Sequence, residues 1–92
     1  MSAGVKRTVV ICNKRGLHAR AAARFVKLAE TFTAEVTVTR RDQSVSGRSI
    51  MGLMMLAAVP GASIDIAGAG DDAEAAIAAL GALVERKFDE DE

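Results

Sequence analysis

Hydrophobic and polar residues alternate along some segments of the chain and recur at helical spacing along others. In residues 5–12, Val5, Val9 and Ile11 fall on one side at a period of two, which predicts a strand with one buried face. From Ala22 onward the apolar positions are three, four and seven residues apart: Ala22, Phe25, Val26 and Ala29. This spacing predicts an amphipathic helix of about three turns.

The middle of the chain predicts a β-hairpin followed by a second helix. Residues 34–40 alternate with Val36 and Val38 inward, and the polar RDQ before Val45 indicates a turn into a short edge strand. Ser49 then stands where the N-cap of a helix is expected, before IMGLMMLAA. Pro60 and Gly61 follow this segment and end the helix.

The last third predicts one more strand and one more helix. Ile64 and Ile66 mark the strand, and the acidic run at 71–74, DDAE, resembles a capping box that opens the final helix. The resulting order, βαββαβα, fits an α+β open-faced two-layer sandwich. We expect residues 1–88 to form a single domain and the acidic residues 89–92 to form a disordered tail.

Composition excludes several classes of partner. The chain has no Trp or Tyr to stack bases, and its 12 basic and 12 acidic residues leave no net field, so nucleic acid is not expected as a ligand. The apolar stretch at 51–59 is far below the roughly 20 residues of a spanning helix, so no membrane insertion is expected. With one cysteine and no signal-like segment, a cytoplasmic location is predicted.

Two motif-like segments, and the single cysteine, are better explained structurally. The run GAGDDA at 68–73 matches a dinucleotide fingerprint, but no further strand follows and its aspartates would repel a pyrophosphate. The run GRSIMG at 47–52 has one residue too many for a nucleophile elbow, and no third residue supports a hydrolase. Cys12 and a single histidine are too few for a closed metal site, so no metal is expected.

The only histidine, His18, lies between a glycine turn and the first helix, in GLHARAAARF. It is either a surface or capping residue or a phosphohistidine. The second interpretation follows from its place, because a helix N-terminus favours phosphate and disfavours a protonated imidazole. Arg20 could then bind phosphoryl oxygens. Arg24 and Lys27 continue a cationic stripe on the same helix face.

The second predicted helix carries more apolar residues than one buried face needs. Leu53 and Leu56 fall on one side and face the core, whereas three residues fall on another side: Ile50, Met51 and Met54. These three form either an exposed docking patch or additional core filling, since methionine fills gaps readily. The spacing alone leaves both interpretations open.

The segments GLHAR and SIMGLMML, at their mutual spacing and in a chain of this length, resemble the HPr family. HPr proteins are the small phosphocarriers of the bacterial phosphoenolpyruvate phosphotransferase system, and the resemblance covers nearly the whole chain. It implies that His18 is the phosphorylated histidine, Arg20 its phosphate-binding partner and Ser49 a regulatory serine. It also implies a four-stranded antiparallel sheet with three helices on one face.

The resemblance further implies partners. His18 is expected to accept a phosphoryl group from phospho-enzyme I and pass it to an enzyme IIA-type acceptor, and Ser49 to be a target of HPr kinase/phosphorylase. Such a protein is a monomeric carrier without cofactor, rather than a free-standing enzyme. Partner binding is expected from the cationic stripe and the apolar patch: Arg24, Lys27, Ile50, Met51 and Met54.

Two points stay open within the resemblance. An HPr-like module that controls partner proteins through its docking face, in a nitrogen-related branch of the system, is the alternative to a phosphocarrier, and the branch of the carrier, sugar or nitrogen-related, is left open. The chain also has Ala21 where the family usually has proline. Proline presets φ in a first helical turn, but alanine is a good helix former there, so we expect a small change in pre-organisation.

Overall fold

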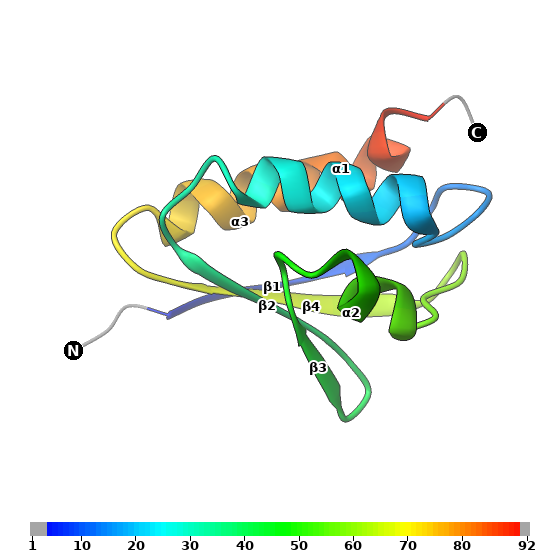
Figure 1. Ribbon diagram of the computed structural model, residues 1–92, viewed down its shortest axis with the longest axis horizontal. Helices are drawn as coiled ribbons and strands as arrows, with labels where there is room; N and C mark the ends of the chain where they lie inside the picture. The colour runs from blue at the N-terminus through cyan, green and yellow to red at the C-terminus, as the bar shows by residue number, and fades with distance from the viewer. Residues whose placement is uncertain (1–3, 91–92) are drawn as a thin grey trace.

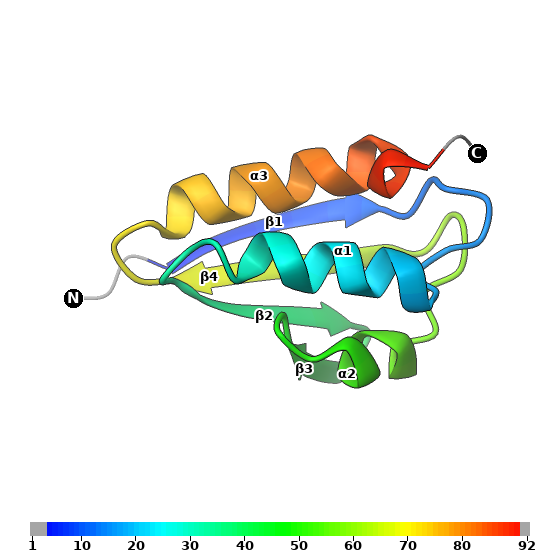
Figure 2. The ribbon, with the colours of Figure 1, turned by 45° about the horizontal axis from the view of Figure 1, so that its top comes forward.

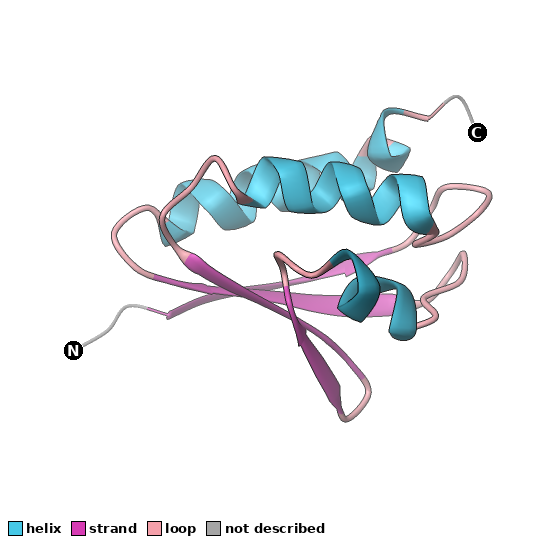
Figure 3. Ribbon diagram, in the orientation of Figure 1, coloured by secondary structure: helices cyan, strands magenta, loops and turns pink. Residues whose placement is uncertain are grey.

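The computed structural model describes residues 4–90. Its elements follow in the order β1 (Gly4–Val10), α1 (Ala19–Ala29), β2 (Glu35–Arg40), β3 (Gln43–Ser46), α2 (Ile50–Met55), β4 (Ser63–Ala69), α3 (Ala73–Glu85) and a short turn, η1 (Lys87–Asp89). The strands form one antiparallel sheet in the order β1-β4-β2-β3, and the helices lie over one face of it (Figure 1, Figure 3). The predicted open-faced α+β sandwich is confirmed.

The strand register places apolar residues from neighbouring strands side by side on the covered face. Val9 of β1 pairs with Ile64 of β4, and Ile66 of β4 pairs with Val38 of β2. All four are buried. Above them α1 and α3 lie next to each other along the sheet, and α2 contacts α1 and the edge strand β3 (Figure 2). The period-two pattern in the sequence is therefore the inner face of this sheet.

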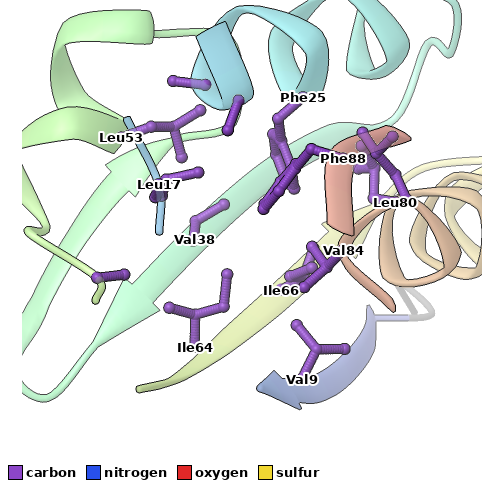
Figure 4. Packing of buried hydrophobic residues seen from close by; sticks show 14 of the residues in the cluster. Val9, Leu17, Phe25, Val38, Leu53, Ile64, Ile66, Leu80, Val84 and Phe88 are labelled. Carbon is purple, nitrogen blue, oxygen red and sulfur yellow. The ribbon is translucent and has the colours of Figure 1, made fainter. Parts of the chain in front are cut away.

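The centre of the core lies between α1, α3 and the sheet. Phe25 of α1 and Phe88 of η1 converge there with Leu80 and Val84 of α3, as Figure 4 shows. Both phenylalanines are fully buried. Because Phe88 follows the last helix, its burial ties the end of the described chain to the body of the domain.

The first helix begins where the sequence placed it, and the second is shorter than predicted. Helix α1 begins at Ala19, directly after His18, although its apolar spacing starts at Ala22, because Ala19 and Arg20 are exposed. Helix α2 ends at Met55 and does not continue to Pro60. Ala57 has φ of 53°, a left-handed conformation that breaks the helix, and the chain then runs on to bury Ala58.

The predicted capping box at the start of α3 is wrong. Asp72 stands at the N-cap, but its side chain makes no hydrogen bond to the helix. Its carboxylate instead accepts the backbone N–H groups of Thr33 (2.8 Å) and Ala34 (2.7 Å), in the connection between α1 and β2. The Thr33 hydrogen bond lowers the pKa of Asp72 below its ordinary value, against the opposing effect of desolvation. Asp72 therefore joins two loops.

The structure places the first two of the four acidic residues at the end of the chain. Residues 89–92 were expected to be disordered, whereas Asp89 lies in η1 and the side chain of Glu90 lies against His18. Burial of Phe88 immediately before them explains why they are held. Residues 91 and 92 lie outside the described residues. Within residues 4–90, no helix has the length and apolar character needed to cross a membrane.

Candidate functional site

A glycine turn carries the chain from β1 to the candidate site. Gly16 has φ of +70°, and a Cβ built on it would lie 2.5 Å from the carbonyl oxygen of Ala58. The next residue, Leu17, donates its N–H to that oxygen at 2.9 Å. The turn is therefore pressed against the segment that follows α2, and only glycine fits at its tightest point. His18 lies two residues after Gly16.

His18 is the N-cap residue of α1, as the predicted helix start required within a few residues. Its backbone is extended (φ −82°, ψ −179°), and its carbonyl oxygen accepts the first bond of the helix, from Ala22. The side chain makes no cap hydrogen bond and is 23% exposed. His18 thus directly precedes the first-turn amides of α1, which have no acceptor within the helix.

One ring nitrogen of His18 is engaged by a carboxylate. Nε2 lies 2.5 Å from Oε2 of Glu90, whose side chain is 14% exposed. Within the described part of the chain, Nδ1 has no hydrogen-bond partner. The two ring nitrogens are therefore different: Nε2 points to Glu90, and Nδ1 is left for another group.

Glu90 is held from a second side by a buried amide. The Nδ2 of Asn13 donates to Oε1 of Glu90 (2.9 Å) and to the carbonyl oxygen of Gly16 (2.8 Å), and Asn13 is fully buried. Burial raises the pKa of Glu90, but the hydrogen bonds from Asn13 and His18 and the charges of His18 and Arg24 outweigh it. The pKa of Glu90 therefore lies below its ordinary value, and the group is an anion at neutral pH.

The cationic stripe divides into residues with different surroundings. Arg20, in the first turn of α1, is exposed and has no partner among residues 4–90, so its guanidinium is available beside His18. Lys27 is exposed near the other end of the helix. Arg24 is half-buried and its Nη1 donates to the carbonyl oxygen of Phe88 at 2.5 Å. The guanidinium of Arg24 thus holds the C-terminal turn, and its expected part in partner binding stays a prediction.

The apolar residues of α2 are exposed, which excludes core filling, while their role as a docking patch stays a prediction. Met51 is 71% exposed, and Ile50 and Met54 also face solvent, whereas Leu53 and Leu56 are buried. Met55 and Val59, which sequence spacing did not single out, extend this exposed surface. We call it the apolar patch: Ile50, Met51, Met54, Met55 and Val59. It borders the candidate site, because the segment after α2 contacts Gly16 and Leu17.

Ser49 is the N-cap of α2, as predicted. Its Oγ accepts the backbone N–H of Gly52 at 2.9 Å, and the residue is half-buried. Ser46, the nearest other serine, is exposed at the end of β3 and accepts the N–H of Arg48 through its Oγ at 3.1 Å. Of these two hydroxyls, the Ser49 hydroxyl is the one at a helix start.

Metal ligands do not gather near His18. Across residues 4–90, no three side chains of His, Cys, Asp or Glu are grouped to hold a metal ion. Cys12 is a free, exposed thiol whose Sγ lies 3.5 Å from the carbonyl oxygen of Val84, on the other side of the loop. The site is a histidine with a carboxylate, an arginine and helix amides.

His18 and Arg20 stand out in the sequence as candidates, whereas Asn13 and Glu90 do not. Glu90 lies 72 residues from His18 in the chain. The one available signal was the polar Asn beside the glycine turn, since a buried asparagine often bonds loop backbone.

These features define a small open-faced α+β sandwich that presents a histidine at a helix N-terminus. The family model described as "PTS HPr component phosphorylation site" matches residues 5–86, so the chain belongs to the HPr family of phosphotransferase-system phosphocarriers. A phosphocarrier protein NPr from Shewanella violacea is 48% identical over 86 residues, covering 94% of each chain. A phosphocarrier protein HPr from Neisseria meningitidis serogroup A is 47% identical over 88 residues, covering 96% of this chain and 99% of that protein.

Solved structures agree with this assignment. The crystal structure of HPr-C-His from Thermoanaerobacter tengcongensis has a TM-score of 0.91 at 42% identity, covering 96% of this chain and 99% of that one. HPr from Bacillus anthracis has a TM-score of 0.83 at 42% identity, covering 87% and 95% of the two chains. The fold and the family are thus supported both by sequence and by structure.

Proposed function

We propose that this protein is a cytoplasmic, monomeric phosphocarrier in which His18 accepts a phosphoryl group from phospho-enzyme I and donates it to a histidine of an enzyme IIA-type acceptor. The observation that carries the proposal is the state of the His18 ring. Nε2 is engaged by Glu90, whereas Nδ1 has no partner within residues 4–90, and His18 is the N-cap residue of α1.

Phosphoryl transfer through His18 needs little covalent chemistry from the protein. The Nδ1 lone pair attacks the phosphorus of the donor's phosphohistidine, and the donor N–P bond breaks with its electron pair returning to the donor nitrogen. In the second step, a nitrogen of the acceptor histidine attacks the phosphorus on His18, and the Nδ1–P bond breaks in the same way. The protein's contribution is to position the ring and to stabilise charge on the moving phosphoryl oxygens.

Two groups beside His18 are suited to those oxygens. The first-turn amides of α1 point out of the helix end, where the helix dipole also favours negative charge. Arg20 is exposed in the same turn and can form charge-assisted hydrogen bonds to the oxygens. Both interactions can be released when the phosphoryl group leaves, because neither forms a covalent bond to it.

Incubation with phosphoenolpyruvate and a cognate enzyme I, followed by intact mass measurement, tests the proposal. Wild-type protein should gain the mass of one acid-labile phosphate, and His18→Ala should gain none while keeping its circular dichroism spectrum. Arg15→Ala is the matched control, because Arg15 is exposed in the preceding loop and has no role in the proposal. Labelling of His18→Ala at the wild-type level would refute the assignment.

We propose that the apolar patch and Lys27 form the surface on which the partners dock. The patch combines exposed apolar side chains with a position beside the His18 turn, and Lys27 supplies charge for acidic partner residues. Met51→Asp should weaken binding to enzyme I with little change in stability. Val10→Asp is the control, since Val10 is also exposed but lies on β1, the opposite edge strand from β3. Equal effects of both variants on binding would count against the patch.

We also propose that a serine kinase regulates the protein at Ser49. A phosphate there would add about two negative charges beside the apolar patch, where it would repel acidic partner surfaces. Ser49→Asp should therefore slow phosphoryl acceptance by His18 while the fold is kept. Ser46→Asp is the control, because Ser46 lies in β3 and has no helix start beside it. Acceptance by Ser49→Asp at the wild-type rate would remove the basis for this switch.

A further inference from the structure

The C-terminal turn returns the chain to the phosphorylation site by a strained route. Lys87, Phe88 and Asp89 have φ values of 60°, 55° and 60°, although none of them is glycine. Left-handed conformations at such residues cost free energy and persist where the surroundings hold them. Here Phe88 is fully buried in the core and its carbonyl oxygen accepts from Arg24. The turn is thus fixed both by the burial of Phe88 and by the hydrogen bond from Arg24, and Glu90 is the residue that follows it.

Glu90 is placed so that both carboxylate oxygens are used. Oε1 accepts from the buried amide of Asn13 and Oε2 meets Nε2 of His18. An ionised carboxylate has no hydrogen to give, so the hydrogen between Glu90 and His18 must lie on Nε2. The neutral ring is then the tautomer with an unprotonated Nδ1.

We propose that Glu90 is a positioning residue for phosphoryl transfer: it holds the proton on Nε2 of His18, which makes Nδ1 the phosphoryl acceptor and compensates the positive charge of the phosphorylated ring. This inference rests on the proposed function of His18. Glu90 lies beyond residues 5–86, the part of the chain that the family model matches.

The proton stays on Nε2 of His18 during both steps of the phosphoryl transfer. When Nδ1 bonds to phosphorus, the ring becomes a cationic phosphoimidazolium, and the Glu90 carboxylate neutralises that charge across the Nε2–H bond. When the acceptor attacks phosphorus, the Nδ1–P bond breaks and its electron pair returns to Nδ1. The leaving group is then neutral imidazole. Without the proton on Nε2 it would be an imidazolate anion, a far poorer leaving group.

The surroundings of Glu90 allow a sharp test through Glu90→Gln. Asn13 donates to Oε1, so the single oxygen of a glutamine would be taken by Asn13 and its NH2 group would face Nε2 of His18. An NH2 group donates to an unprotonated nitrogen. The variant should therefore shift the hydrogen of the neutral ring from Nε2 to Nδ1, the nitrogen that the reaction needs unprotonated.

Charged groups near this contact include Arg20 in the first turn of α1, Arg24, which acts on Glu90 through its charge, and the pair of Arg86 with Asp89 at 3.0 Å. Asp89→Asn is accordingly the matched control. It removes one carboxylate from the same turn, and within residues 4–90 the hydrogen-bond and ion-pair partner of the Asp89 side chain is Arg86, not His18.

The experiment combines nitrogen-15 NMR of the His18 ring with single-turnover transfer from phospho-enzyme I. Wild type and Asp89→Asn should show a protonated Nε2 and an unprotonated Nδ1. Glu90→Gln should show the reverse tautomer and accept phosphate roughly 10- to 100-fold more slowly, the loss typical of removing the outer partner of a metal-bound histidine. Circular dichroism and thermal unfolding of each variant report on the fold.

The results separate the proposed role of Glu90 from the proposed function of His18. Retention of the wild-type tautomer in Glu90→Gln, or transfer at the rate of Asp89→Asn, would overturn the role of Glu90. If the wild type itself took up no phosphate, the proposed function of His18 would fail. The tautomer measurement on the unphosphorylated protein would still show whether Glu90 controls the ring.

Discussion

The turn that delivers His18 should be intolerant of any side chain at Gly16, for two separable reasons. A left-handed φ costs a residue with a Cβ about 1–2 kcal/mol, and the φ of Gly16 is +70°. The added Cβ would also lie 2.5 Å from the backbone oxygen of Ala58, which forces the loop to move. Overpacking of this kind costs about 1–3 kcal/mol. Gly16→Ala should therefore lose roughly 2–5 kcal/mol of unfolding free energy.

Two other glycines separate these costs. Gly61 has φ of +91° and nothing within 4 Å of its built Cβ, so Gly61→Ala should lose only the conformational part, about 1–2 kcal/mol. Gly4 has neither a positive φ nor a near neighbour, so Gly4→Ala should be close to neutral. Urea unfolding at constant m-value measures all three variants. A loss in Gly16→Ala equal to that in Gly61→Ala would refute the close contact with Ala58.

Two further predictions concern electrostatics. Because the pKa of Asp72 is lowered in the native state, its stabilising effect is present above its ordinary pKa of 3.8 and is lost as the pH falls through the native value. The difference in melting temperature between wild type and Asp72→Asn should therefore be constant near neutral pH and shrink below about pH 3.8; a pH-independent difference would contradict it. Arg20→Ala should slow transfer even at saturating partner, whereas Lys27→Ala should slow association and lose its effect at high salt; equal, salt-insensitive losses would contradict that division.

The sheet and its helices were predictable because their residues repeat at regular periods. Val36 and Val38 in β2, or Phe25 and Val26 in α1, each bury one face, and that pattern is visible in the chain itself. The helix ends were less visible. The end of α2 depends on the left-handed conformation of Ala57, which cannot be predicted from the sequence because alanine rarely adopts it.

Only those residues of the candidate site that lie close together in the sequence were predictable. His18 and Arg20 are two residues apart, and their relation to a helix start can be inferred from the sequence around them. Glu90 reaches His18 through three left-handed residues without a glycine, held by the burial of Phe88 and by Arg24. Both the turn and its anchors depend on tertiary packing, so an acidic chain end gave no sign that one of its carboxylates is held in place.

The most direct test of the central claim is the position of the phosphoryl group on the phosphorylated protein. Protein labelled with nitrogen-15 in its single histidine, after transfer from phospho-enzyme I, should show one phosphorus nucleus coupled to Nδ1 of His18. Phosphorus bonded to Nε2, bonded to a serine hydroxyl, or absent from the protein would contradict the account.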